Sequence, residues 1–78
     1  SNQDNKPRKP SYKEKTEFVA LDAEIQSLEA LKKEILNKMN SGACGPDELE
    51  KLSRDYQETE IALEEKTNRW LELSELFE

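Results

Sequence analysis

The side chains that most often carry catalysis or metal binding are scarce in this 78-residue sequence. It contains no histidine, and its single cysteine, Cys44, has no second soft ligand, which argues against a zinc or haem site. Carboxylate pairs such as Glu64 and Glu65 are plentiful, but a carboxyl group becomes a general acid where burial raises its pKa, and a two-helix hairpin offers no such pocket. We therefore predict a non-catalytic chain without a cofactor or metal of its own.

Contact with phosphate is the chemistry that the charge pattern favours. The net charge is −6, yet residues 1–15 carry five basic side chains against two acidic ones, and residues 32–54 carry five against four. The segments 16–31 and 55–78 are acidic, so a polyanion is expected to meet the chain at the two basic segments. The candidate nucleic-acid contacts are Lys6, Arg8, Lys9, Lys13, Lys15, Lys33, Lys38, Lys51 and Arg54.

Two further patterns have a functional and a structural interpretation. Residues 42–45, Gly-Ala-Cys-Gly, match the bare Gly-x-x-Gly pattern of an RNA-binding module, but they lack its basic residues and sheet and are expected to form a turn. Aromatic rings can stack on nucleic-acid bases. The spacing of Tyr56, Trp70 and Phe77 favours core packing instead, while Tyr12 lies off that spacing and both interpretations stay open for it.

The overall composition is typical of long helices. Hydrophobic residues make up 33% of the chain and charged residues 38%, which is too polar for a rounded core. No apolar run approaches the ~18 residues that a membrane span requires, and no signal-peptide pattern opens the chain. We therefore expect a cytoplasmic location and no membrane partner.

The first helix is predicted over about residues 12–40. Residues 1–10 read as a flexible basic linker, whose Ser1-Asn2 is typical of a scar left by an expression tag. Ser11 with Glu14 three residues later forms a capping box that opens the helical domain, residues 11–78. Gly42 is expected at the C′ position that ends the helix. The seam of this helix comprises Phe18, Leu21, Ile25, Leu28, Ile35 and Met39, interrupted by Lys32.

The second helix is predicted over about residues 46–77, after a turn at about 41–45. Pro46 suits the first helical position, and the acids that follow suit the positive end of the helix dipole. Lys32 of the first seam and Lys66 of the second are expected to set the register and to extend their ammonium groups outward. The second seam comprises Leu49, Leu52, Tyr56, Thr59, Leu63, Lys66, Trp70, Leu73 and Phe77.

The short turn predicts an all-α fold, an antiparallel two-helix coiled-coil hairpin. Two registers that differ by one heptad fit the turn, and both stay open. The second pairs Leu21 with Leu63. The first pairs Phe18 with Leu73, Leu21 with Trp70, Leu28 with Leu63, Ile35 with Tyr56 and Lys32 with Thr59.

Three stretches of the chain carry a family resemblance. Residues 9–15 read Lys-Pro-Ser-Tyr-Lys-Glu-Lys, residues 21–29 read Leu-Asp-Ala-Glu-Ile-Gln-Ser-Leu-Glu, and residues 69–73 read Arg-Trp-Leu-Glu-Leu. They are similar to the Lys-x-Ser-Tyr-Lys-Glu entry, the Leu-x-x-x-Ile-x-x-Leu-Glu helix and the closing Arg-Trp-x-x-Leu element of one domain type. Over about residues 9–78, the chain thus resembles the C-terminal coiled-coil domain of an ABC-F family ATPase of the Uup type.

The resemblance implies a parent protein that is bacterial and cytosolic, with two tandem ATP-binding cassettes and no membrane domain. Members of this family act on translating ribosomes, and the Uup-type domain is associated with DNA binding. ATP and Mg²⁺ are then expected only in the cassettes, because the present chain has no Gly-x-x-x-x-Gly-Lys-Ser/Thr loop. The partners implied are DNA or ribosomal RNA and the cassettes of the same parent chain.

The leading hypothesis is an accessory domain that contacts DNA or ribosomal RNA through the basic linker and the hairpin tip. The alternative is a structural spacer or protein-docking coiled coil without nucleic-acid binding. The chain is expected to be monomeric, with weak dimerisation through apolar residues beside the seams. Those residues are Leu31, Leu36, Ile61 and Leu71.

Overall fold

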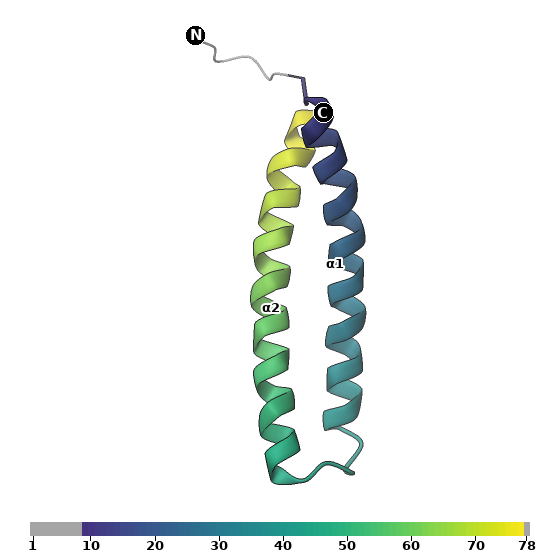
Figure 1. The fold of residues 1–78 in the computed structure, drawn as a ribbon, viewed down its shortest axis with the longest axis vertical. Coiled ribbons are helices and arrows are strands. Elements are labelled where there is room, and N and C mark those ends of the chain that lie inside the picture. Colours follow the sequence, from purple (N-terminus) through teal and green to yellow (C-terminus); the bar gives the residue numbers. More distant parts are fainter. Residues whose placement is uncertain (1–8, 78) are drawn as a thin grey trace.

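The computed structural model describes residues 9–77, which form two long antiparallel helices and one short final turn (Figure 1). Helix α1 spans Tyr12–Met39, α2 spans Pro46–Ser74, and the 3-10 helix η1 spans Glu75–Phe77. The predicted all-α helical hairpin is confirmed. Where one helix was expected to continue to about residue 77, the last three described residues tighten into the 3-10 geometry that is common at helix ends.

The helix starts follow from local side-chain chemistry. The Ser11 hydroxyl accepts a hydrogen bond from the backbone N–H of Glu14 at 3.1 Å, and the Glu14 carboxylate accepts one from the backbone N–H of Ser11 at 2.9 Å. This is the predicted capping box, which satisfies two backbone donors that a helix start leaves unpaired. Helix α2 begins with Pro46 as its first residue, after Gly45 as N-cap.

The turn between the helices is closed mainly by backbone and small side chains. Helix α1 ends with Asn40 as its C-cap, so Ser41 rather than Gly42 occupies the predicted C′ position. Gly42 nevertheless has a φ of 78°, the left-handed conformation expected of it. The Lys38 carbonyl accepts hydrogen bonds from the Ser41 hydroxyl at 2.8 Å and from the Cys44 thiol at 3.3 Å. The Cys44 thiol therefore contributes one weak hydrogen bond to the turn.

The hydrophobic core is a single stripe between the helices. Its buried apolar residues are Leu21 and Ile35 from α1 and Leu52 and Leu73 from α2, of which only Leu73, 1% exposed, is fully buried. Thr59 is also buried, and its hydroxyl donates to the Asp55 carbonyl at 2.7 Å, so no polar group is left unsatisfied there. The result is a rod of 58 × 18 × 17 Å.

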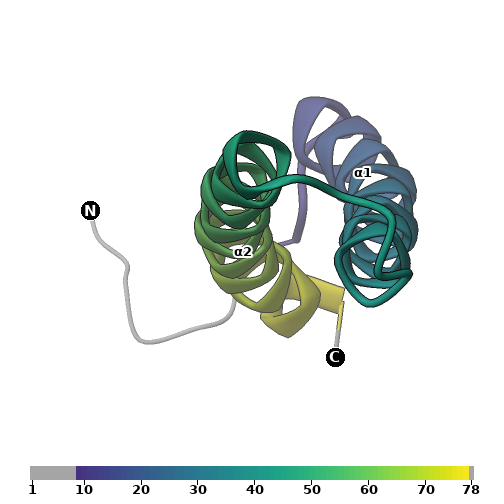
Figure 2. The same ribbon diagram turned by 90° about the horizontal axis from the view of Figure 1, so that it is seen from below.

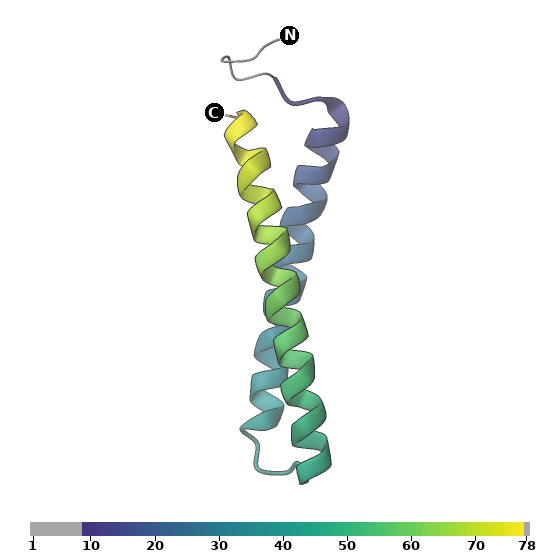
Figure 3. The same cartoon turned by 90° about the vertical axis from the view of Figure 1, so that its left-hand side faces the viewer.

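The two helices cross near the middle of the rod when it is viewed from the side, and they lie as a single pair when it is viewed along its axis (Figures 2 and 3). This gentle crossing is what a seam with a seven-residue repeat produces. We call the end where α1 begins and η1 ends the base, and the end that carries the turn the tip.

The cross-helix contacts of Lys32 distinguish the two registers. Its ammonium group lies 3.3 Å from the Glu60 carboxylate and 5.5 Å from the centre of the Tyr56 ring, so its contacts flank Thr59, its partner in the first register. The second register would instead have paired Lys32 with Leu52, two turns away, so the structure favours the first.

The aromatic contacts depart from the pairing of that first register. Phe18 was paired with Leu73, but its ring stacks on Trp70 at 5.2 Å between centroids and lies 4.7 Å from the Phe77 ring. Aromatic side chains are long enough to reach a neighbouring layer of the seam. Contact between two rings stabilises the fold beyond the burial of their apolar area, which favours this arrangement. The base is thus closed by an aromatic cluster made of Phe18, Trp70 and Phe77.

Candidate nucleic-acid interface

The first candidate group lies at the base and is defined here as the base lysines, Lys9, Lys13 and Lys15. All three side chains are exposed, and none forms an ion pair with another residue of the described range 9–77. Lys6 and Arg8, which belong to the same predicted group, lie outside the described residues. The base lysines are therefore accessible to a bound anion, although Lys13 also interacts electrostatically with Glu17.

Tyr12 lies among the base lysines and is 85% exposed. Successive residues of a helix turn by about 100°, so Lys13 and Lys15 project on either side of Tyr12 in the first turn of α1. An exposed ring flanked by two cations is an arrangement that can stack on a base while the ammonium groups meet the neighbouring phosphates. The position of Tyr12 away from the core is confirmed, while its contact with nucleic acid remains a prediction.

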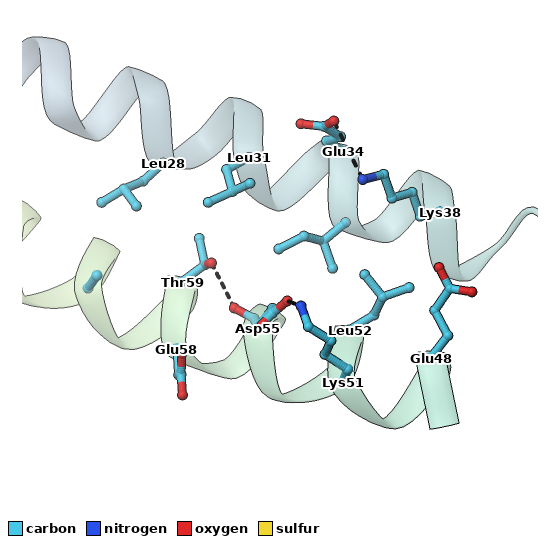
Figure 4. A pocket seen from close by; sticks show the side chains of 12 residues that line it. Leu28, Leu31, Glu34, Lys38, Glu48, Lys51, Leu52, Asp55, Glu58 and Thr59 are labelled. Carbon is cyan, nitrogen blue, oxygen red and sulfur yellow. Dashed lines mark hydrogen bonds and ion pairs between the residues drawn. The ribbon is translucent and has the colours of Figure 1, made fainter. Parts of the chain in front are cut away.

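The second candidate group lies at the tip, and most of its charges are already paired. Lys38 lies 3.8 Å from Glu34, Lys51 lies 3.0 Å from Asp55, and Arg54 lies 4.0 Å from Glu50, in each case one turn away on the same helix. Figure 4 shows the first two of these pairs. Lys33 is exposed and has no ion pair among the described residues.

The structure therefore does not bring the two groups together. Lys15 and Lys33 are separated by 18 residues of a continuous helix, which is about 27 Å along the rod. A single short duplex end can contact the base or the tip, but it contacts both only if it lies along the rod. Such a duplex would pass acidic side chains on the way, which is unfavourable for a polyanion.

The acids near the base are largely engaged across the helix pair. Arg69 of α2 donates two hydrogen bonds to the Glu17 carboxylate of α1, at 2.8 and 3.0 Å, and a third to Glu72 at 3.0 Å. This contact lowers the pKa of Glu17 from its ordinary value of 4.5 and raises the pKa of Arg69. Lys66 likewise meets Glu24 at 2.9 Å. Neutralising Glu17 and Glu24 reduces the repulsion that an anion near the base lysines would feel.

The two seam lysines behave as predicted. The side chains of Lys32 and Lys66 leave the core and end on acids of the other helix, Glu60 and Glu24. The hydrogen bond from Lys32 to Glu60 raises the pKa of the Lys32 ammonium. Their charges are thus used to join the helices and are not free for a ligand.

The other aromatic residues are used mainly for packing. Trp70 and Tyr56 are half-buried, and the indole N–H of Trp70 is buried without a hydrogen-bond partner among the described residues. Phe77 contacts Phe18 but remains 45% exposed, so it is less enclosed than a core position implies. Base stacking by Trp70 would require opening the aromatic cluster.

Sequence reasoning did not find an open groove between the helices near the tip. We define the tip groove by its floor residues Leu28, Leu31, Ile35, Leu52, Thr59 and Ala62 (Figure 4). The signal for it was the small residue Ala62 beside the seam, where a longer side chain would have covered the core. Over residues 9–77, no helix combines the length and the apolar character that a membrane span requires.

Comparison with known proteins gives one positive finding. Residues 9–75 match a protein-family model described as the ABC transporter C-terminal domain. No curated protein and no solved structure matches the chain significantly. The matched range begins at Lys9, before the capping box, and extends into η1, so it covers both helices and the turn.

Proposed function

Because the chain belongs to the ABC transporter C-terminal domain family, we propose that it is the accessory domain of an ABC-F-type ATPase of the Uup type and contacts DNA or ribosomal RNA. It is an accessory domain of an ABC protein by family, and the nucleic-acid contact is the proposed part. ATP and Mg²⁺ are assigned to the cassettes of the parent protein, and catalysis with them. We further propose that the parent protein is bacterial and cytoplasmic and associates with ribosomes.

The observation that carries this proposal is the exposure of the base lysines, which form no ion pair within residues 9–77, around an exposed Tyr12. Cations that already hold a carboxylate must give it up before they meet a phosphate, so Lys38, Lys51 and Arg54 are weaker candidates than Lys9, Lys13 and Lys15. The base therefore ranks first as the contact, and the tip second. Each neutralised phosphate also releases counterions, which makes the binding dependent on salt.

The test is a fluorescence-anisotropy titration of the 78-residue chain against a labelled DNA duplex and a labelled RNA hairpin at low salt. Replacing Lys9, Lys13 and Lys15 together by glutamine is expected to weaken binding by about tenfold or more and to make the salt dependence shallower. A triple replacement of Lys33, Lys38 and Lys51 removes the same charge at the tip and is expected to have a smaller effect. Circular dichroism confirms that both variants remain helical.

Three outcomes would count against the nucleic-acid contact. The first is no binding by the unmodified chain at about 100 µM, and the second is binding that does not change with salt. The third is an equal loss in the two triple variants, since this would mean that only the net charge matters. Tyr12→Ala separates stacking from charge, because it removes the ring without removing a cation.

A second candidate function, a protein-docking or spacer hairpin, is favoured by the apolar side chains that the fold leaves outside. Leu31, Leu36, Ile61 and Leu71 are 43%, 37%, 57% and 50% exposed, so apolar surface beside the seams is accessible to a partner. Sedimentation over a range of concentrations tests whether this surface supports dimerisation of the chain. If the chain is monomeric at all concentrations and does not bind nucleic acid, the spacer role is the candidate function that remains.

A further inference from the structure

The tip groove has an apolar floor that runs along one side of the hairpin. Leu28, Leu31 and Ile35 of α1 face Leu52 and Ala62 of α2 across it, and the groove encloses about 480 Å³. Thr59 is the one hydroxyl on this floor, and it is already bonded to the Asp55 carbonyl at 2.7 Å, so it presents its methyl group rather than an unsatisfied donor. The lining residues of α2 run from 48 to 62, which is about 21 Å or four helical turns.

The other side of the same seam is closed. There Lys32 lies over the Tyr56 ring at 5.5 Å and pairs with Glu60 at 3.3 Å, which covers the core with a side chain from each helix. On the groove side, Ala62 is too short to do so, and Leu31 stays 43% exposed. The hairpin therefore has one covered and one uncovered side at the same height.

The edges of the groove are acidic, mainly along α2. Its lining includes the acids Glu34, Glu48, Asp55 and Glu58 against Lys38 and Lys51. The two lysines are held by Glu34 and Asp55, whereas Glu48 and Glu58 have no ion pair among the described residues. In Figure 4 both of these carboxylates belong to α2, with Glu48 near the turn and Glu58 further along the helix. An occupant thus meets an apolar floor with uncompensated negative charge along one edge.

We propose that the tip groove binds an amphipathic helix of a partner protein, with an apolar stripe on the floor and lysine or arginine residues along the flank that faces α2. The bound state is a three-helix bundle in which the new helix covers Leu31 and Ala62. Such a helix-in-groove mode takes its affinity from the apolar anchors and its orientation from the charged flank.

A second copy of this chain does not meet that description. The whole chain carries a net charge of −6, and the lining of the groove itself has four acids against two lysines. Two such hairpins that joined their grooves would bring Glu48 and Glu58 of each near the acids of the other, which is repulsive. Charge complementarity therefore favours a basic partner helix over self-association.

The test uses the 78-residue chain and a defined probe, a fluorescein-labelled synthetic peptide of about 16 residues with leucines at helical spacing and lysines on one flank. Binding is measured by anisotropy at moderate salt. Leu31→Glu is expected to weaken it by about tenfold or more, because the anchor site is lost. This variant adds negative charge, so a general attraction between the basic peptide and an acidic protein would be strengthened by it.

Matched controls come from the same helices. Leu36→Glu makes the same change five residues further along α1, on the closed side of the seam, and is expected to leave the affinity within about twofold. Glu58→Lys is expected to weaken binding more than Glu64→Lys, which changes the net charge equally but lies outside the groove. Circular dichroism of each variant verifies that the hairpin is intact.

The proposal is overturned by an equal response of Leu31→Glu and Leu36→Glu, which would show general electrostatic attraction. It is also overturned if the probe fails to bind the unmodified chain at about 1 mM, since groove-bound helices bind more tightly than that. Sedimentation supplies the last outcome. A dimer that Leu31→Glu dissociates would identify a second copy as the occupant and would refute the partner helix.

Discussion

The base and the tip of this hairpin are joined by different interactions. At the base, the aromatic cluster packs across the two helices, and Arg69 and Lys66 of α2 form ion pairs with Glu17 and Glu24 of α1. At the tip, the pairs formed by Lys38, Lys51 and Arg54 remain within one helix, and an open groove replaces the cover of the core. The base is joined by stacked rings and a bidentate ion pair, whereas towards the tip the Lys32–Glu60 pair covers one side of the seam and leaves the other side open.

The comparison indicates that one half of the rod provides most of the contacts between the helices, while the other half exposes apolar surface to a partner. In the half towards the base, the aromatic cluster and the ion pairs of Arg69 and Lys66 join the two helices. The half that is less tightly joined keeps an apolar surface exposed. Regions that bind partners are commonly those with fewer internal contacts, because contacts used internally are not available to a ligand.

The largest difference is expected from truncating one core leucine at each end. Leu73→Ala should lower the free energy of unfolding by about 3 kcal/mol and Leu52→Ala by about 2 kcal/mol, because Leu73 is the more completely enclosed side chain. Chemical denaturation followed by circular dichroism measures both. A larger loss for Leu52→Ala would mean that the tip, not the base, is the better-packed half.

A smaller effect is expected at the turn, where the backbone conformation matters more than side-chain contacts. Gly42→Ala should cost about 1 kcal/mol, since an alanine at a φ of 78° is strained although its Cβ meets no atom within 4 Å. Gly45→Ala is the control, because Gly45 has a φ of −76° and equally open surroundings. If both variants have the same Tm as the parent chain, the conformation of Gly42 does not contribute to the stability of the tip.

Replacing one arginine at each end compares an ion pair between helices with one inside a helix. Arg69→Met should lower Tm by a few degrees, because Glu17 and Glu72 both lose their partner, and Arg54→Met should leave Tm nearly unchanged. Both substitutions keep an unbranched side chain on an exposed or half-exposed position. Equal Tm values for the two variants would show that the ion pairs at the base do not join the helices.

The smallest effect is expected in the pH dependence of the base. The Arg69 hydrogen bonds hold the pKa of Glu17 below its ordinary value of 4.5, so ionised Glu17 stabilises the fold above that pH. Its contribution is lost as the pH falls through the lowered pKa. The Tm difference between the parent chain and Glu17→Gln should therefore be constant from about pH 7 to about pH 6 and should vanish in stronger acid. A difference that grows on acidification would contradict this assignment.

The secondary structure was predictable because its signals are local. The capping box of Ser11 and Glu14 and the first-position Pro46 act within one turn, and the seven-residue repeat of each seam fixes which face of each helix is buried. A short turn then leaves only the antiparallel arrangement. These features depend on residue spacing alone, which is visible in the sequence.

Contacts between the helices were less predictable because they depend on side-chain length and shape. The spacing placed Phe18 opposite Leu73, but rings that extend beyond their layer joined Phe18 to Trp70. The bidentate contact of Arg69 with Glu17 likewise depends on the reach of two long side chains. Which candidate cations form ion pairs was also invisible. Lys13 and Lys51 each have an acid four residues later, but Glu17 pairs with Arg69 whereas Asp55 pairs with Lys51.

The meeting of Phe18 with Phe77 has a mechanical consequence, because it places the start of α1 and the end of η1 side by side. A domain attached through the residues that precede α1 would therefore be joined to the hairpin at its base. Helix α2 is 29 residues long, about 43 Å, so a tilt of about 10° at the attachment swings the far turn by roughly 8 Å. A small rotation at the base is thereby converted into a displacement of the turn that exceeds the length of a side chain.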